Sequence, residues 1–223
     1  MPGKIVGTKV AINRLAFERA LCAQGRRAIA GLDEAGRGPL AGPVVAAAVV
    51  LPVPWIETGM PAELEDLNDS KQLTRHQRDR FFAYLMATAP IRYGISMVEA
   101  AVIDAINILQ ATHRAMHLAV AQLEPRPDHL LIDGLPVKSL PVPQTALVGG
   151  DGRSYSIAAA SVLAKVTRDR LMEEYDRLYP GYGFAEHKGY GTAAHLAALA
   201  ERGPCPIHRR SFAPLKAQQL TLF

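Results

Sequence analysis

The sequence predicts an α/β fold with a mixed sheet and flanking helices. Short apolar runs that end near an acid, a glycine or a proline are typical of buried strands. Longer segments with helix-start and helix-stop signals lie between and after them. The first two strands are joined by too few residues for a crossover helix, so we expect them to pair antiparallel. The predicted strands are residues 28–33, 44–51, 91–97, 129–133 and 145–148.

The predicted helices are identified mainly by their ends. Thr74 and Gln77 have the spacing of a capping box, in which each side chain satisfies a backbone group of the first turn. A Glu-Pro-Arg-Pro segment ends the helix expected after residue 100, and Pro180-Gly181 ends the next. The helices predicted in this way are 10–24, 74–87, 100–123, 157–178 and 192–200.

Composition excludes several classes of protein. Hydrophobic residues make up 49% of the 223 residues and charged residues 21%, which is enough to bury a core. Two cysteines, Cys22 and Cys205, exclude a disulfide scaffold and an all-cysteine zinc site within one chain. No apolar run is long enough to span a bilayer, and the N-terminal segment lacks the apolar core of a signal peptide. We therefore expect a cytoplasmic protein with reduced thiols and no membrane contact. A monomer is the default expectation, because nothing in the sequence indicates a homo-oligomer.

The positive charge is concentrated near the C-terminus. The formal net charge is +4. From Arg177 onward the sequence contains six basic residues and only two acidic ones, Glu186 and Glu201. A localised basic surface suits a polyanion such as nucleic acid. On charge alone, a solubilising surface remains the simpler interpretation.

Four acids follow apolar strands and lie beside glycines. Asp33 and Glu34 end the first strand, Asp133 ends the fourth, and Asp151 follows the fifth. Carboxylates gathered at one sheet edge repel each other and are usually stabilised by a divalent cation. Ligands that are all oxygen favour Mg²⁺ or Mn²⁺, and two such ions about 4 Å apart suit phosphodiester hydrolysis. Any one Asp-Gly pair, taken alone, reads as a turn.

Two polar loops are further candidates for binding. The glycines at 36, 38 and 42 do not have dinucleotide-fingerprint spacing, and a strand rather than a helix follows them. The loop can instead hold a nucleic-acid backbone through amides and Arg37, or serve as a plain hairpin connection. Residues 68–71 could contact phosphate or simply lead into the helix that follows. His113 and His117 are read as surface residues rather than zinc ligands.

The chain resembles bacterial ribonuclease HII over almost its whole length beyond the first 25 residues. The matching segments include AGLDEAGRGPLAGPVVAAAV (30–49), LNDSKQL (67–73), LLIDG (130–134), GDGRSYSIAAASVLAKVTRDRLM (150–172), YGFAEHKGYGT (182–192) and HRRSF (208–212). The resemblance implies a ribonuclease H fold, with a mixed five-stranded sheet, flanking helices and a C-terminal helical extension. It also implies metal-dependent hydrolysis of the RNA strand of RNA–DNA hybrids, and incision 5′ of single ribonucleotides in duplex DNA.

The resemblance also assigns site residues. The family's four acids fall on Asp33, Glu34, Asp133 and Asp151, the acids already selected by their place at strand ends. Asp151 is preferred to Asp169 as the fourth, on family spacing and because it follows a strand. By resemblance, Gly36-Arg37-Gly38 contacts the backbone and the 2′-hydroxyl, while Tyr190 stacks under the following deoxyribose. The further substrate contacts implied are Lys71, Ser161, Lys165, Arg209 and Arg210.

Four segments and a terminal motif complete the prediction. The expected segments are an N-terminal helical part (1–25), a catalytic core (26–172), a helical substrate-binding extension (173–212) and a flexible tail (213–223). The last five residues resemble the pentapeptide that binds the bacterial sliding clamp, through Gln219, Leu220, Leu222 and Phe223. A disordered or self-packed tail is the alternative. A non-catalytic hybrid- or clamp-binding protein of the same fold is the alternative to an enzyme, and loss of one acid would have favoured it.

Overall fold

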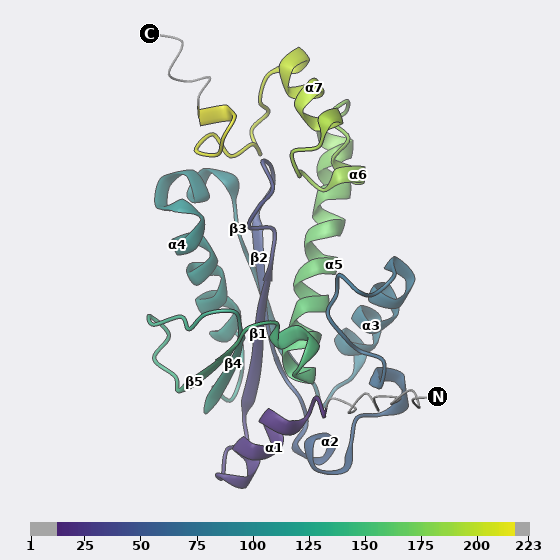
Figure 1. Cartoon of the computed structure of the whole chain (residues 1–223), viewed down its shortest axis with the longest axis vertical. Helices are drawn as coiled ribbons and strands as arrows, with labels where there is room; N and C mark the ends of the chain where they lie inside the picture. Colours follow the sequence, from purple (N-terminus) through teal and green to yellow (C-terminus); the bar gives the residue numbers. More distant parts are fainter. Residues whose placement is uncertain (1–12, 217–223) are drawn as a thin grey trace, which may run out of the picture.

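A central five-stranded sheet organises the computed structural model, which describes residues 13–216. The strand order is β3-β2-β1-β4-β5, with helices on both faces (Figure 1). The mixed five-stranded sheet expected from the sequence is confirmed, and the strand ends differ from the prediction by only one or two residues. The strands are β1 (Ile29–Ala35), β2 (Val44–Val50), β3 (Arg92–Val98), β4 (His129–Asp133) and β5 (Gln144–Leu147).

Strand direction brings distant parts of the chain to one edge of the sheet. β1 pairs antiparallel with β2, as predicted, and β2 pairs antiparallel with β3. On its other side β1 runs parallel to β4, with Leu32 opposite Ile132, and β4 runs parallel to β5. Because β1 and β4 run in the same direction, their carboxyl ends meet at the same edge.

Both faces of the sheet are covered, which explains why β2 is apolar along its whole length. Its alternate residues Val45, Ala47 and Val49 join a core that includes residues of α5 (Tyr155–Leu178). The intervening residues of β2 join a second core with α4 (Ala100–Val120). In Figure 1 the two long helices lie on opposite sides of the sheet.

Two strand glycines allow these helices to approach closely. A Cβ atom at Gly31 would lie 2.1 Å from the backbone carbon of Ser156 in α5. A Cβ atom at Gly94 would lie 2.1 Å from the carbonyl oxygen of Ala119 in α4. Neither position has room for a side chain, so backbone packs directly on backbone at both contacts.

The capping box is confirmed, and one predicted helix is interrupted. Thr74 Oγ1 accepts a hydrogen bond from the Gln77 amide at 3.2 Å, and Gln77 Oε1 accepts one from the Thr74 amide at 2.9 Å. The prediction of one continuous helix over 100–123 was wrong, because Asn107 has a φ of 67° inside α4. Asn107 Oδ1 then accepts from the Gln110 amide at 3.1 Å and caps the part that follows. The remaining helices are α1 (Ala16–Ala23), α2 (Val53–Thr58), η1 (Ala62–Leu64), α3 (Arg75–Ala87), η2 (Gly150–Gly152), α6 (Phe184–His187) and α7 (Ala193–Arg202).

A buried carboxylate fastens α1 to the start of α5. Glu18 is fully buried, and its Oε1 accepts hydrogen bonds from Ser154 Oγ at 2.6 Å, Ser156 Oγ at 2.8 Å and the Ser156 amide at 3.1 Å. Ser154 also caps α5 by accepting from the Ile157 amide. The helix predicted over 10–24 begins at Ala16 in the part of the chain that the structure describes.

The C-terminal part packs around the far end of α5, where α6 and α7 lie (Figure 1). Its core holds a polar chain of side chains: His195 Nε2 lies 3.0 Å from His208 Nε2, and His208 Nδ1 lies 3.1 Å from Cys205 Sγ. The segment boundary predicted at residue 172 falls inside α5, and the division into segments stays a prediction. Among the described helices, none combines the length and apolar character needed to cross a membrane.

Candidate active site

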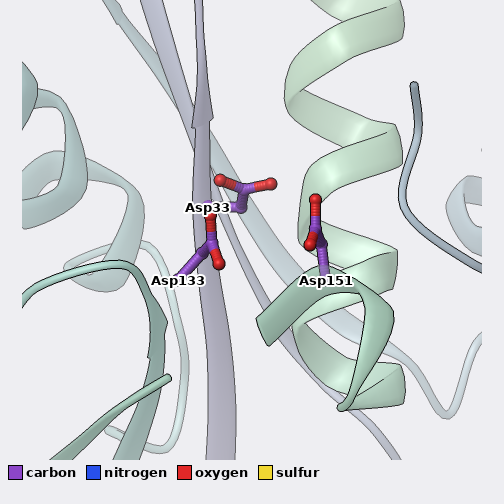
Figure 2. A group of neighbouring side chains, drawn as sticks. All are labelled: Asp33, Asp133 and Asp151. Atoms are coloured by element: carbon purple, nitrogen blue, oxygen red, sulfur yellow. The ribbon is translucent and has the colours of Figure 1, made fainter. Parts of the chain in front are cut away.

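Three aspartates converge at the sheet edge where β1 and β4 end. Asp33 lies near the end of β1, Asp133 ends β4, and Asp151 is carried by η2 just before α5. One carboxylate oxygen from each lies within 4.8 Å of the other two. Figure 2 shows the three side chains pointing into a common space. The parallel pairing of β1 with β4 is the reason that residues far apart in sequence meet here.

Backbone amides hold one oxygen of each carboxylate. The amide of Glu34 donates to Asp33 Oδ1 at 2.7 Å, and that of Gly152 donates to Asp151 Oδ1 at 2.9 Å. The amide of Gly150 donates to Asp133 Oδ1 at 2.7 Å, which ties η2 to the end of β4. The turns around the acids therefore position the carboxylates on a rigid frame.

Burial and like charge make the three carboxylates electrostatically costly. Burial, followed by the charges of Glu34 and Asp133, raises the pKa of Asp33 well above its usual range. Burial, followed by the charges of Asp133 and Asp69, raises the pKa of Asp151 to about 6. A cation between the oxygens would relieve both effects. Three buried or half-buried carboxylates with only oxygen donors fit a hard divalent cation.

Glu34 lies beside this group but faces Arg37. Its Oε1 is 3.2 Å from Arg37 Nη1, and its side chain is only 15% exposed. Burial raises the pKa of Glu34 and the Arg37 charge opposes that rise. Glu34 is not one of the three acids whose oxygens converge, so its role as a fourth ligand stays a prediction.

A cavity of about 280 Å³ opens beside the aspartates. It brings together seven residues that the sequence predicted as substrate contacts. Ser161 Oγ donates to Ser70 Oγ at 2.9 Å, and Lys165 Nζ forms a 2.8 Å ion pair with Asp169. Burial lowers the pKa of Lys71, but the pKa is raised overall by the negative charges of four nearby aspartates, Asp69, Asp33, Asp151 and Asp133. The cavity is lined by Asp33, Glu34, Ala35, Gly36, Arg37, Gly38, Ser70, Lys71, Ser161, Lys165, Arg168 and Tyr190.

The structure places Asp151, rather than Asp169, next to Asp33 and Asp133. Asp169 is bound to Lys165 and lines a separate, smaller cavity with charged residues of α3 and α5. Asp169 is not among the acids whose oxygens converge in the described part of the chain. This geometry supports the choice of Asp151, whose role as a metal ligand stays a prediction.

Arg209 does not face the cavity, which corrects the expectation of a direct phosphate contact. Its side chain is fully buried, and its guanidinium donates to the carbonyl oxygens of Gly36, Arg37 and Gly42. Arg210 is exposed but lies outside the cavity, and its amide donates to Asp104. A phosphate contact by Arg210 stays a prediction.

Sequence reasoning missed the part played by Arg168. This residue is 1% exposed, and it donates to the carbonyl oxygens of Ala41, Pro43 and Lys188 while lining the cavity. The available signal was its spacing in α5, since 161, 165, 168 and 172 fall on one helix face. The predicted clamp-binding residues 219–223 lie outside the described residues.

Comparison with known proteins gives one consistent result. A family model described as Ribonuclease HII matches residues 30–215. A curated relative named Ribonuclease HII, from Geobacter metallireducens, is 55% identical over 90% of this chain and 90% of its own. The crystal structure of the ribonuclease H2 from Pyrococcus horikoshii matches with a TM-score of 0.69 and 28% identity, over 86% of this chain and 97% of that one. A solved PCNA:RNase HII complex from Archaeoglobus fulgidus matches with a TM-score of 0.64 and 23% identity, over 82% of this chain and 93% of that one.

Proposed function

Because the chain belongs to the ribonuclease HII family, we propose that its three-aspartate site cuts the RNA strand of RNA–DNA hybrids and nicks duplex DNA 5′ of a single ribonucleotide. The enzyme is a type 2 ribonuclease H, an endonuclease that depends on divalent metal. The observation that carries the assignment of the site is the convergence of Asp33, Asp133 and Asp151 beside a cavity lined by basic residues and glycines.

Asp33, Asp133 and Asp151 would hold the divalent ion, with Glu34 available from the adjacent position. We take Mg²⁺ or Mn²⁺ as the ion and two ions as the working arrangement. When bound, the metal supplies Lewis acidity that activates water and stabilises the leaving oxygen. The aspartates contribute fixed negative oxygens, held by the amides of Glu34, Gly150 and Gly152.

The rest of the cavity is suited to the sugar–phosphate backbone. Arg37, Lys71 and Lys165 line it with positive charge, which favours a phosphodiester. Gly38 lies across from Tyr190, since a Cβ atom at Gly38 would be 3.7 Å from the tyrosine ring. Tyr190 is 47% exposed, so its ring is available for stacking on a sugar. In the proposed binding mode the glycine loop meets the 2′-hydroxyl, the group that distinguishes RNA from DNA, and Tyr190 meets the deoxyribose that follows.

Cleavage of a labelled DNA duplex with one ribonucleotide tests the proposal. With Mg²⁺ or Mn²⁺ we expect a single nick on the 5′ side, which chelator abolishes. Asp133→Asn should lower the rate at least about 100-fold, as loss of an electrostatic stabiliser at a reaction centre does. Asp66→Asn, at an exposed position on the same protein, is the matched control. Normal cleavage by Asp133→Asn would contradict the site, and no cleavage by the wild type with either metal would contradict the function.

We propose further that the C-terminal residues Gln219, Leu220, Leu222 and Phe223 bind the replication sliding clamp. The motif itself supports this, and the Archaeoglobus fulgidus protein of similar fold is an RNase HII in complex with PCNA. A pull-down with the clamp should retain the full chain and lose a chain that ends at residue 218. Equal retention of both chains would rule the motif out. The cytoplasmic location and the monomeric state stay predictions from the sequence.

A further inference from the structure

Two buried arginines surround the glycine loop of residues 36–43. Arg168, on α5, and Arg209, near the C-terminus, are 1% and 0% exposed. Neither forms an ion pair with a carboxylate among the described residues. A buried guanidinium without an acidic partner is costly unless its N–H groups are satisfied in another way.

Backbone carbonyl oxygens accept the hydrogen bonds of both guanidinium groups. Arg209 donates from Nη2 to Gly36, from Nη1 to Arg37 at 2.9 Å and from Nε to Gly42 at 3.0 Å. Arg168 donates from Nε to Pro43 at 3.0 Å and from Nη2 to Ala41 at 3.1 Å. Five carbonyls of one short loop are therefore directed toward two cations.

Backbone N–H groups of the same loop remain free to donate hydrogen bonds to a ligand. Within residues 13–216, the amides of Arg37 and Gly38 have no backbone acceptor, and both residues line the cavity beside the aspartates. Amides whose neighbouring carbonyls are turned away form a site suited to an anion or a hydroxyl oxygen.

Arg168 also reaches the other side of the cavity. Its Nη1 donates to the carbonyl of Lys188 at 3.0 Å, two residues before Tyr190. The amide of Leu40 donates to the Gly189 carbonyl at 2.8 Å and strengthens the same connection. One guanidinium thus holds the glycine loop and the tyrosine segment in a common arrangement.

We propose that Arg168 and Arg209 are positioning residues for ribonucleotide recognition: they orient the Arg37 and Gly38 amides, and Arg168 sets the spacing between that loop and Tyr190. The inference rests on the proposed function, and it assigns these arginines no contact with substrate or metal. Their charge adds positive potential behind the loop, which favours the phosphodiester. Lysine cannot replace either of them, because a single ammonium cannot reach carbonyls spread around a planar fork.

The test compares Arg168→Lys and Arg209→Lys with Arg177→Lys, the same exchange at an exposed position of α5. Each protein is assayed on a DNA duplex with one ribonucleotide and on the same duplex with a 2′-fluoro nucleotide there. We expect the two buried variants to lose at least tenfold in kcat/KM on the ribonucleotide, and to lose much of their preference for it. Mn²⁺ affinity, measured by titration calorimetry, should stay within twofold of wild type, which a general loss of structure would not allow.

Three results are distinguishable. If the wild type does not cut the ribonucleotide duplex, the proposed function fails. If the wild type cuts and the folded buried variants match Arg177→Lys, the positioning role is overturned. If the variants do not fold, hydrogen exchange on the wild type in chelator decides. Slower exchange of the Arg37 and Gly38 amides when the ribonucleotide duplex is bound supports the proposal, and unchanged exchange refutes it.

Discussion

Replacing Gly31 by alanine tests whether the close approach of β1 to α5 supports the site. The added Cβ atom would lie 2.1 Å from the carbon, 2.3 Å from the oxygen and 2.4 Å from the following nitrogen of the Ser156–Ile157 peptide. All three are backbone atoms, so the clash cannot be relieved by a change of side-chain rotamer. To regain the 3.4 Å of ordinary contact, strand and helix must separate by about 1.3 Å.

The separation should affect both stability and metal binding. Overpacking of a core costs about 1–3 kcal/mol, and a clash between two backbones belongs at the upper end, about 3 kcal/mol. The start of α5 is connected to the acids, since the Ser154 amide donates to the Gly150 carbonyl at 2.8 Å and the Gly150 amide donates to Asp133. Moving α5 therefore moves η2 and Asp151 away from Asp33. We expect Mn²⁺ affinity to fall at least about tenfold, as it does when the surroundings of metal ligands are disturbed.

Gly94→Ala is the matched control, because its Cβ atom would meet the Ala119 carbonyl at the same 2.1 Å on the other face of the sheet. Urea unfolding should show a similar loss of stability for both variants, while calorimetry should show weaker Mn²⁺ binding only for Gly31→Ala. A Gly31→Ala protein with wild-type stability and affinity would refute the reasoning. Equal losses of affinity in both variants would show that the effect is not specific to α5.

Three further predictions follow from single contacts. Asp151→Asn should weaken Mn²⁺ binding at least about tenfold while Asp169→Asn leaves it unchanged, and calorimetry giving the reverse order would reject the choice of Asp151. Glu18→Gln should lower the free energy of unfolding by roughly 2 kcal/mol, the worth of hydrogen bonds to a buried charge, whereas exposed Glu63→Gln should not, and equal urea midpoints would contradict this. Burial, and then the charge of His195, lowers the pKa of His208 from 6.5 to about 4. The unfolded state therefore binds a proton before the folded state does, and roughly 3 kcal/mol of stability should be lost as the pH falls from 6.5 to 4. His208→Asn should lose less over that range, and an identical pH dependence of the two urea midpoints would sink the idea.

The features that could be predicted from the sequence depend on residues close to one another in the chain. The Thr74 capping box needs only four consecutive residues, and it formed as expected. The acids Asp33 and Asp133 were found because each ends an apolar strand, and parallel strands bring such ends to one edge. The family resemblance added the identity of the substrate, which strand ends alone do not reveal.

What the sequence did not reveal depends on long-range packing. A charged side chain is normally read as exposed, so the burial of Glu18, Arg168 and Arg209 could not be inferred without the groups that surround them. The same reasoning misassigned Arg209 to the surface. The break at Asn107 was not predicted, because the helical sequence pattern continues on both sides of it. The Asn107 side chain caps the helical part that follows.

The pairing of β1 with β4 also has a consequence for synthesis of the protein on the ribosome. Asp33 leaves the ribosome early, whereas strand β4, which carries Asp133, and the turn that carries Asp151 follow only after more than half of the chain has been made. Until then the first aspartate has neither of the two carboxylates with which it converges. A nascent chain or an early truncation product therefore lacks the complete three-aspartate site. Under the proposed function, such a chain cannot cut nucleic acid until α5 packs on the completed sheet.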